Sequence, residues 1–177
     1  MRPTHRFITS MTAVIGTLVG LAILFVVLVD LFTTVLNPGS SGLVAYRVTD
    51  AFWHLALRLH RRRPSHRLLS GVGVTLVAFL PIIWLVLMWA GWSAIFLSQP
   101  RSVLNATTMA PSDASSKVYY AGYTLFTSGL GDHIPGSGPW QIITVVASAM
   151  GLGLVTLAIT FLMGVLGAAN HRRATAR

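Results

Sequence analysis

A polar segment, TLFTSGLGDHIP, interrupts the apolar chain at residues 124–135. Its two glycines, Gly129 and Gly131, alternate with other residues, and glycine adopts left-handed backbone angles without steric cost. When every second residue is left-handed, successive carbonyls point to one side, and a stack of carbonyl oxygens can replace the water around a dehydrated cation. The hydroxyl of Thr127 would add the innermost oxygen. The spacing is therefore compatible with a stack of backbone carbonyls that could hold a cation.

The remaining side chains offer little other chemistry. The chain has no cysteine, so disulfides and thiolate metal sites are excluded. Its four acidic residues are all aspartates, and its six histidines are scattered. Since no paired carboxylates, metal-ligand cluster or nucleophile–base arrangement appears, we expect no enzyme activity and no cofactor other than the permeant ions.

Long apolar runs must position this segment. Of the 177 residues, 54% are hydrophobic and 10% are charged, whereas a soluble domain carries about a quarter charged residues. Three runs are long enough for the helix of about 20 residues that crosses a bilayer: Phe7–Leu36, Leu68–Ser98 and Pro139–Ala169. The first run is too long for a cleavable signal peptide. We therefore expect an all-α integral membrane protein with three spans.

Arginine provides almost all of the positive charge behind the net value of +9, and it lies beside the apolar runs. This placement indicates membrane topology signals, so we expect no nucleic-acid partner. The connection between the first two spans carries six arginines: Arg47, Arg58, Arg61, Arg62, Arg63 and Arg67. The positive-inside rule places this connection and the C-terminus in the cytoplasm, with the N-terminus outside. The excess of arginine over lysine fits a bacterial source, so we expect the bacterial plasma membrane.

The first connection, residues 37–67, is predicted to form a basic amphipathic helix. Its apolar side recurs every three or four residues, at Val44, Val48, Phe52, Leu55 and Leu59. Its polar side carries Arg47, Asp50, His54, Arg58 and Arg61. We expect this helix in the membrane interface, with anionic lipids bound at Arg58, Arg61, Arg62 and Arg63. A helix packed on the other spans is the alternative.

The second connection contains a helix that is too short to cross the membrane. Ser112 and Asp113 are typical of a helix start, and the pattern continues to Phe126. A helix of about 14 residues is about 21 Å long, enough to enter the bilayer halfway. Non-helical backbone at that depth is tolerated only where protein buries it or where it lines a water-filled path. The half-helix and the polar segment after it therefore predict a pore or a binding site.

One span, a half-helix, the sequence TSGLGD and a second span follow one another along the chain. Together they resemble the pore domain of the potassium-channel superfamily, whose signature is TVGYGD. Thr127, Gly129, Gly131 and Asp132 match the signature, while Ser128 replaces valine and Leu130 replaces tyrosine. The resemblance covers residues 68–169. It implies an outer helix at 68–98, a pore helix at 113–126, a filter at 127–132 and an inner helix at 139–169. Residues 1–36 are then an extra transmembrane helix, 37–67 the cytoplasmic helix and 170–177 a cytoplasmic tail.

The resemblance also implies roles for single residues. K+ would bind at Thr127, Ser128, Gly129 and Leu130, with Gly131 completing the filter. Asp132 would brace the filter from behind through an aromatic residue of the pore helix, and Tyr119 lies at the matching position, near Tyr120 and Tyr123. Simple packing at the interface is the alternative for these tyrosines. His133 either tunes conductance with pH or is merely solvated.

Two glycines, Gly151 and Gly153, lie in the middle of the third span. Gly151 matches the position of the superfamily's gating hinge, counted from the filter aspartate. Glycine weakens a helix by about 1 kcal/mol relative to alanine, which favours a bend there. Close helix packing through small residues is an equal alternative. The part of this span that follows, including Thr156, Thr160 and Met163, would line the cavity or gate.

Asp30 is an acid inside the first span, which is a functional-site hypothesis by default. We expect it to pair with an arginine of the first connection; gating or proton sensing is the second choice.

A filter ring in the superfamily that the chain resembles needs four strands. One chain supplies one strand and no repeat is visible, so the resemblance implies a homotetrameric potassium channel. Because Ser128 is small and polar, a channel that admits both Na+ and K+ is the first alternative. A non-conducting membrane assembly subunit is the second.

Overall fold

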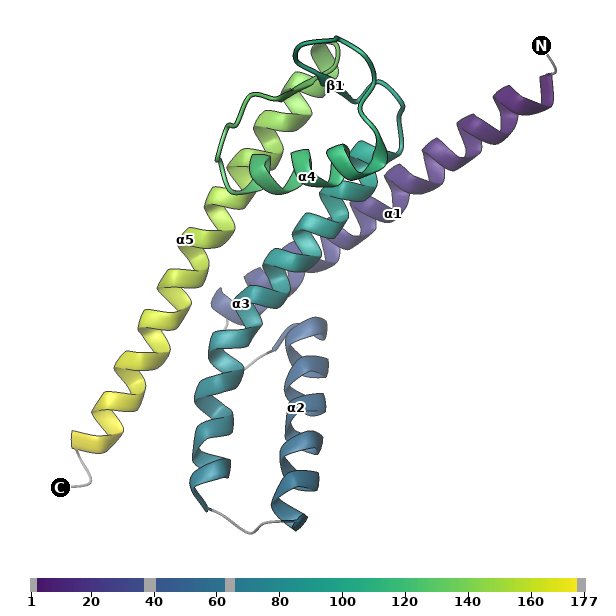
Figure 1. Cartoon of the computed structure of the whole chain (residues 1–177). Helices are drawn as coiled ribbons and strands as arrows, with labels where there is room; N and C mark the ends of the chain where they lie inside the picture. Colours follow the sequence, from purple (N-terminus) through teal and green to yellow (C-terminus); the bar gives the residue numbers. More distant parts are fainter. Residues whose placement is uncertain (1–2, 37–40, 63–65, 175–177) are drawn as a thin grey trace. The chain divides into compact units, whose positions relative to one another are not determined.

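In a computed structural model of the chain, residues 3–36, 41–62 and 66–174 are described. They form, in chain order, α1 (Pro3–Leu36), α2 (Leu43–Arg62), α3 (His66–Leu97), β1 (Val103–Asn105), α4 (Ala114–Leu125), β2 (His133–Pro135) and α5 (Gly138–Ala174), as Figure 1 shows. Three stretches of these helices are long and apolar enough to cross a membrane: Met11–Leu36, Phe79–Leu97 and Gly138–Met163. The predicted all-α membrane fold with three spans is confirmed.

The chain divides into two compact units, and the first contains α1 as far as Phe25 together with Val86–Leu154. Within this unit α1 packs on α3 through glycines. A Cβ atom at Gly20 would lie 2.7 Å from the carbonyl oxygen of Gly91, so the two helix backbones approach closely. The hydroxyl of Thr17 donates to Oγ of Ser98 over 3.0 Å. The part of α1 in this unit is therefore packed closely on α3.

Two short strands join the two ends of the connection between α3 and α5 in the same unit. β1 and β2 are antiparallel, and Asn105 pairs with His133. α4 follows an N-cap at Asp113, whose carboxylate accepts the N–H of Ser116 over 2.9 Å. This bond satisfies one of the free N–H groups of the first turn. The chain on both sides of the filter segment is thus attached to the same small framework.

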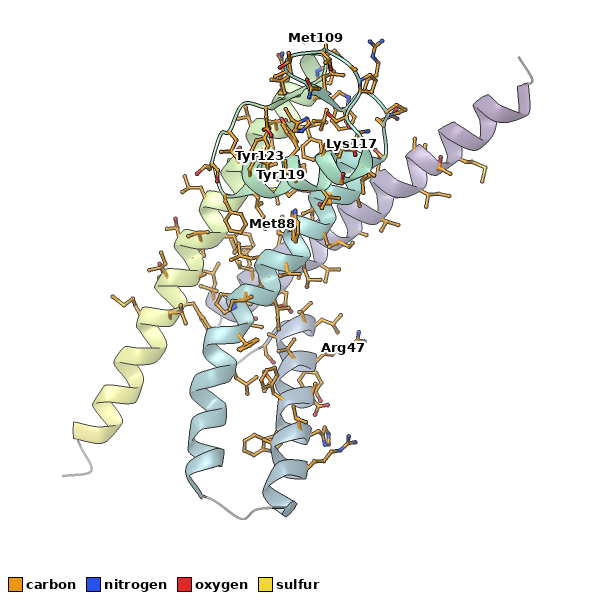
Figure 2. The ribbon with its side chains drawn as sticks, in the orientation of Figure 1. Arg47, Met88, Met109, Lys117, Tyr119 and Tyr123 are labelled. Carbon is orange, nitrogen blue, oxygen red and sulfur yellow. The ribbon has the colours of Figure 1, made fainter. Side chains whose placement is uncertain are left out.

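The second unit comprises Val26–Leu85 and Val155–Arg177. Here α2 lies alongside the first part of α3 (Figure 1), and the rings of Phe52 and Phe79 are 5.7 Å apart. Arg47 projects from the side of α2 that is turned away from α3 (Figure 2). These contacts favour the packed alternative over a helix lying by itself in the interface. Leu55, which the sequence pattern places on the apolar side, is 56% exposed.

In the described part of the chain, Asp30 bonds N–H groups in place of the expected arginine. Its buried carboxylate accepts the N–H of Val44 over 2.6 Å, the N–H of Ala45 over 3.1 Å and the indole N–H of Trp84 over 2.7 Å. Among the described residues, no cation forms a salt bridge with it. The first N–H groups of a helix lack partners within the helix and attract negative charge. Asp30 therefore caps α2.

Candidate cation site

The polar segment begins where α4 ends. The N–H groups of Thr127 and Ser128 bond to the carbonyls of Thr124 and Tyr123, over 3.1 Å and 2.9 Å. These bonds close the last turn of the helix and start the segment in a defined direction. The C-terminal end of α4 therefore lies directly before the filter, and the partial negative charge of a helix C-terminus favours a nearby cation.

The backbone of the segment alternates as a carbonyl stack requires. Thr127, Gly129 and Gly131 have φ angles of 55°, 57° and 82°. The sequence indicates this alternation at the two glycines only. Thr127 extends it by one residue, although a β-branched residue rarely adopts positive φ. Threonine occurs in ordinary strands and helices, so its residue type does not predict a positive φ. The angle at Thr127 is seen only in the folded structure.

The residues of the polar segment are exposed in the single chain. Thr127 through Asp132 are all exposed, and Leu130 is 60% exposed. A Cβ atom at Gly129 or Gly131 would meet nothing within 4 Å. These glycines are therefore required by their backbone angles and not by a lack of space in the chain itself.

The three tyrosines of α4 make different contacts (Figure 2 labels Tyr119 and Tyr123). The hydroxyl of Tyr123 donates to the carbonyl of His133, the residue after Asp132. The hydroxyl of Tyr120 bonds Oγ1 of Thr144 on α5 over 2.8 Å. Tyr119 is closest to the predicted role, since partial desolvation and then the negative charge of Asp132 raise the pKa of its hydroxyl. One tyrosine thus faces the aspartate, one holds the chain after it and one anchors α4 to α5.

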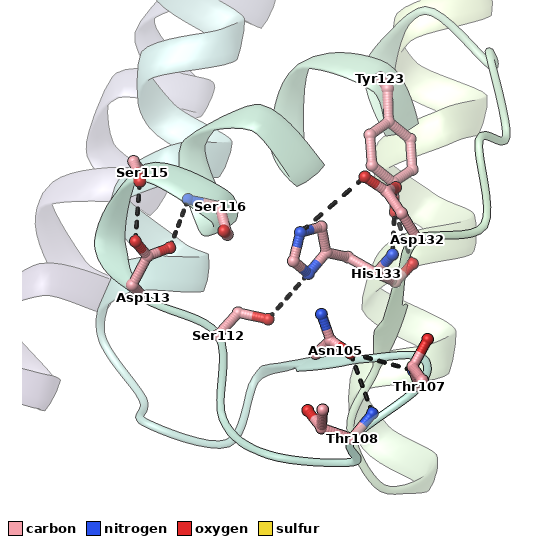
Figure 3. A network of polar contacts seen from close by, with 10 residues as sticks. All are labelled: Asn105, Thr107, Thr108, Ser112, Asp113, Ser115, Ser116, Tyr123, Asp132 and His133. Atoms are coloured by element: carbon pink, nitrogen blue, oxygen red, sulfur yellow. Dashed lines mark hydrogen bonds and ion pairs between the residues drawn. The ribbon is translucent and has the colours of Figure 1, made fainter.

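The structure contradicts the alternative in which the side chain of His133 is merely solvated. Its Nδ1 lies 3.0 Å from Oγ of Ser112, and its Nε2 lies 3.9 Å from a carboxylate oxygen of Asp132 (Figure 3). Its side chain is only 12% exposed. The ring therefore links the return from the filter to the residue just before the cap of α4.

Gly151 has a packing reason. A Cβ atom there would lie 1.9 Å from the carbonyl oxygen of Leu125, whereas one at Gly153 would meet nothing within 4 Å. α5 is helical from Gly138 to Ala174. The C-terminal turn of α4 thus rests directly on the backbone of α5, which accounts for glycine at position 151; its role as a hinge stays a prediction.

Other residues expected along α5 face outward in the single chain. Thr156, Thr160 and Met163 are exposed, and the hydroxyl of Thr160 donates to the carbonyl of Thr156 over 3.0 Å. Their position on an open face of α5 is compatible with the predicted lining of a cavity or gate, which stays a prediction.

Lys117 is a functional candidate that the sequence did not single out. It is 5% exposed on α4, and its ammonium group donates to the carbonyl of Gln99 after α3. Burial lowers the pKa of this lysine. The signal that could have found it is a lone lysine in an apolar half-helix, a position where charge is costly unless it has a partner.

An open pocket of about 340 Å³ is lined in part by the polar segment. Its walls come from α4, the segment and α5: Tyr120, Tyr123, Thr124, Thr127, Gly129, Gly131, His133, Thr144 and Ser148. The hydroxyl of Ser148 donates to the carbonyl of Thr124 over 3.2 Å. The site therefore joins a half-helix, a left-handed alternating strand and a spanning helix in one unit, the arrangement of an ion-conducting pore module.

Comparison with known proteins agrees with this class. Residues 82–167 match the family described as "ion channel". This part of the chain is thus similar to a two-span module like that of potassium channels. The matched range contains the second half of α3, all of α4 with the polar segment, and most of α5. No solved structure matches the chain.

A comparison along most of this chain gives a longer relative. The chain is 31% identical over 159 residues to the uncharacterized membrane protein YdjJ of Bacillus subtilis (strain 168). The match covers 89% of this chain and 46% of the relative, so the chain spans about half of that protein. The similarity reaches beyond the ion-channel module and supports a membrane location for this chain.

Proposed function

We propose that four copies of this chain assemble around a central pore and conduct potassium ions. Each copy would contribute one strand, Thr127–Gly131, whose carbonyls replace the hydration shell of the ion. The observation that carries the proposal is the positive φ at Thr127, Gly129 and Gly131. Three alternate left-handed residues directly after a half-helix have little use in a buried loop, but they turn consecutive carbonyls toward one side.

We propose the orientation that the arginine distribution favours. The N-terminus and the second connection, residues 99–138, would lie outside, and α2 would lie on the cytoplasmic side of a bacterial plasma membrane. Arg58 is exposed on α2 and is available to anionic headgroups; the side chains of Arg61, Arg62 and Arg63 lie outside the described residues.

A weakly selective cation channel is the second candidate, and Ser128 supports it. Its N–H bonds the carbonyl of Tyr123, and its side chain is small and exposed. A small residue at this position fills less space behind the strand than the valine of the potassium-channel signature. Since packing behind the strand keeps the carbonyls at one spacing, a looser strand admits Na+ more easily.

Ion flux into liposomes tests these proposals. Purified protein should carry K+ flux that barium blocks, with Na+ flux much lower. Equal Na+ and K+ flux would favour the weakly selective channel, and no flux with either ion would favour a non-conducting assembly subunit. Ser128→Val should raise the K+ to Na+ ratio, whereas Ser115→Val, an exposed change in the first turn of α4, should leave the ratio as it is.

A further inference from the structure

We propose that Asp30 and Trp84 form a joint through which α2 controls the inner helix α5. This inference rests on the proposed channel function and adds a regulatory input from the cytoplasmic helix. Asp30 and Trp84 are 1% and 0% exposed. A buried carboxylate in a span is costly unless its bonds are satisfied, so a carboxylate kept at this place calls for a role.

The carboxylate connects three helices. It belongs to α1, it caps the N-terminus of α2 through the N–H groups of Val44 and Ala45, and it accepts the indole N–H of Trp84 on α3. The carboxylate of Asp30 can lie close to the start of α2 because residue 42 is glycine. A Cβ atom at Gly42 would lie 2.1 Å from Oδ1 of Asp30. The start of α2 therefore cannot shift without moving this carboxylate or breaking its bonds.

Trp84 carries the connection onward to α5. Its ring meets that of Phe161 edge to face, with centroids 6.1 Å apart and an interplanar angle of 62°. Phe161 follows Thr160, in the part of α5 where the gate is expected. A buried indole cannot turn freely in a packed interior. A change at the carboxylate therefore changes the position of the ring and the packing of Phe161.

The regulatory signal would act on the exposed side of α2. Arg47 and Arg58 are exposed there, and basic residues next to a span are attracted to anionic lipid headgroups. The occupant that we infer is therefore an anionic membrane surface. Binding it would pull on α2, and the capped first turn would pass that pull to α3 and α5.

A double-mutant cycle tests the joint. Potassium flux is measured for the full chain in vesicles of zwitterionic lipid and in vesicles with about one third phosphatidylglycerol. Wild-type flux should change by about threefold or more between the two. Asp30→Asn replaces one acceptor oxygen with an amide donor that faces the N–H groups, and Trp84→Phe removes the indole N–H but keeps a ring beside Phe161. Each should abolish most of the lipid response, and the double variant should add nothing.

Matched controls separate the joint from general damage. Asp50→Asn removes a carboxylate that is exposed on α2 and paired with His54, so it should keep the full response and combine additively with Trp84→Phe. Gly42→Ala displaces the carboxylate without changing its charge, and it should act like Asp30→Asn. A merely structural role would lower the yield of folded protein and leave the response of each channel unchanged.

Each outcome of these flux measurements either supports the joint or overturns it. A full lipid response in Asp30→Asn, in Trp84→Phe or in Gly42→Ala overturns the joint and leaves the channel function standing. Wild-type flux that ignores anionic lipid does the same. If Asp30→Asn does not fold, Trp84→Phe and Gly42→Ala carry the test. Wild-type protein without any flux overturns the channel function and the joint together.

Discussion

The carbonyl oxygen of Leu125 occupies the space that a side chain at position 151 would need, since a Cβ atom on Gly151 would lie 1.9 Å from it. The last turn of α4 is thereby seated on the backbone of α5. This contact fixes the height and direction at which the chain leaves α4 and enters the filter segment.

Gly151→Ala should therefore destabilise the pore module by about 1–3 kcal/mol through overpacking. The loss would appear as a lower unfolding temperature and less assembled protein in detergent. Gly153→Ala is the matched control, because its Cβ meets nothing within 4 Å and alanine favours the helix by about 1 kcal/mol. Equal stability of the two variants would argue against the packing role and for the hinge.

Gly129→Ala should abolish or strongly reduce potassium flux. Its φ of 57° costs any L-residue about 1–2 kcal/mol, and relief of that strain would turn a carbonyl away from the ion path. Gly138→Ala also adds a methyl group in open space, but at a residue without a positive φ, and should keep its flux. Normal selectivity in Gly129→Ala would contradict the carbonyl stack.

Tyr123→Phe should lower the K+ to Na+ permeability ratio while the protein stays folded. The change removes only the hydroxyl that donates to the carbonyl of His133, which holds the chain directly after the filter. Tyr46→Phe removes the hydroxyl of a tyrosine that is 61% exposed on α2 and should keep the ratio. Reversal-potential measurements in a planar bilayer give the ratio directly; a ratio unchanged in Tyr123→Phe would rule out this support.

The cap of α4 should make stability depend on acid pH. Hydrogen bonds from the side chain and backbone of Ser116 and from Ser115 lower the pKa of Asp113 from 3.8 to about 2. Because the folded pKa is the lower one, the stabilisation is complete above the ordinary pKa and is lost as pH falls from there toward the folded value.

The unfolding temperature, followed from about pH 5 to about pH 2.5, checks this dependence. Asp113→Asn keeps a capping oxygen but does not titrate, so it should lose less stability over that range than the wild type. Parallel curves for the two proteins would show that the cap does not contribute.

Gly20→Val should detach α1 from α3. A Cβ atom there would lie 2.6 Å from Cγ1 of Ile95 and 2.7 Å from the carbonyl of Gly91, so the backbones must separate, at about 1–3 kcal/mol. Gly16→Ala is milder, with its Cβ 3.3 Å from that of Ser98. Thermal unfolding in detergent compares them; similar losses in both variants would count against the close contact at Gly20.

Much of the site was predictable because its chemistry is local. The residue type of Gly129 and Gly131 indicates left-handed backbone, and Ser112 and Asp113 indicate the start of a helix. Partners that come from distant parts of the chain leave no such mark. His133 bonds Ser112, and Tyr123 bonds the carbonyl of His133, through a return loop whose path no spacing reveals.

The sequence by itself determined the three spans, the half-helix and the pore module, because apolar length, helix-start residues and glycine spacing are properties of short segments. Only the tertiary structure decided what Asp30 binds. The sequence favoured arginine, since charge attracts charge. The folded chain instead brings the free N–H groups of α2 and the indole of Trp84 to the carboxylate. These donors satisfy a buried acid without burying a second charge, which is the cheaper arrangement in an apolar interior.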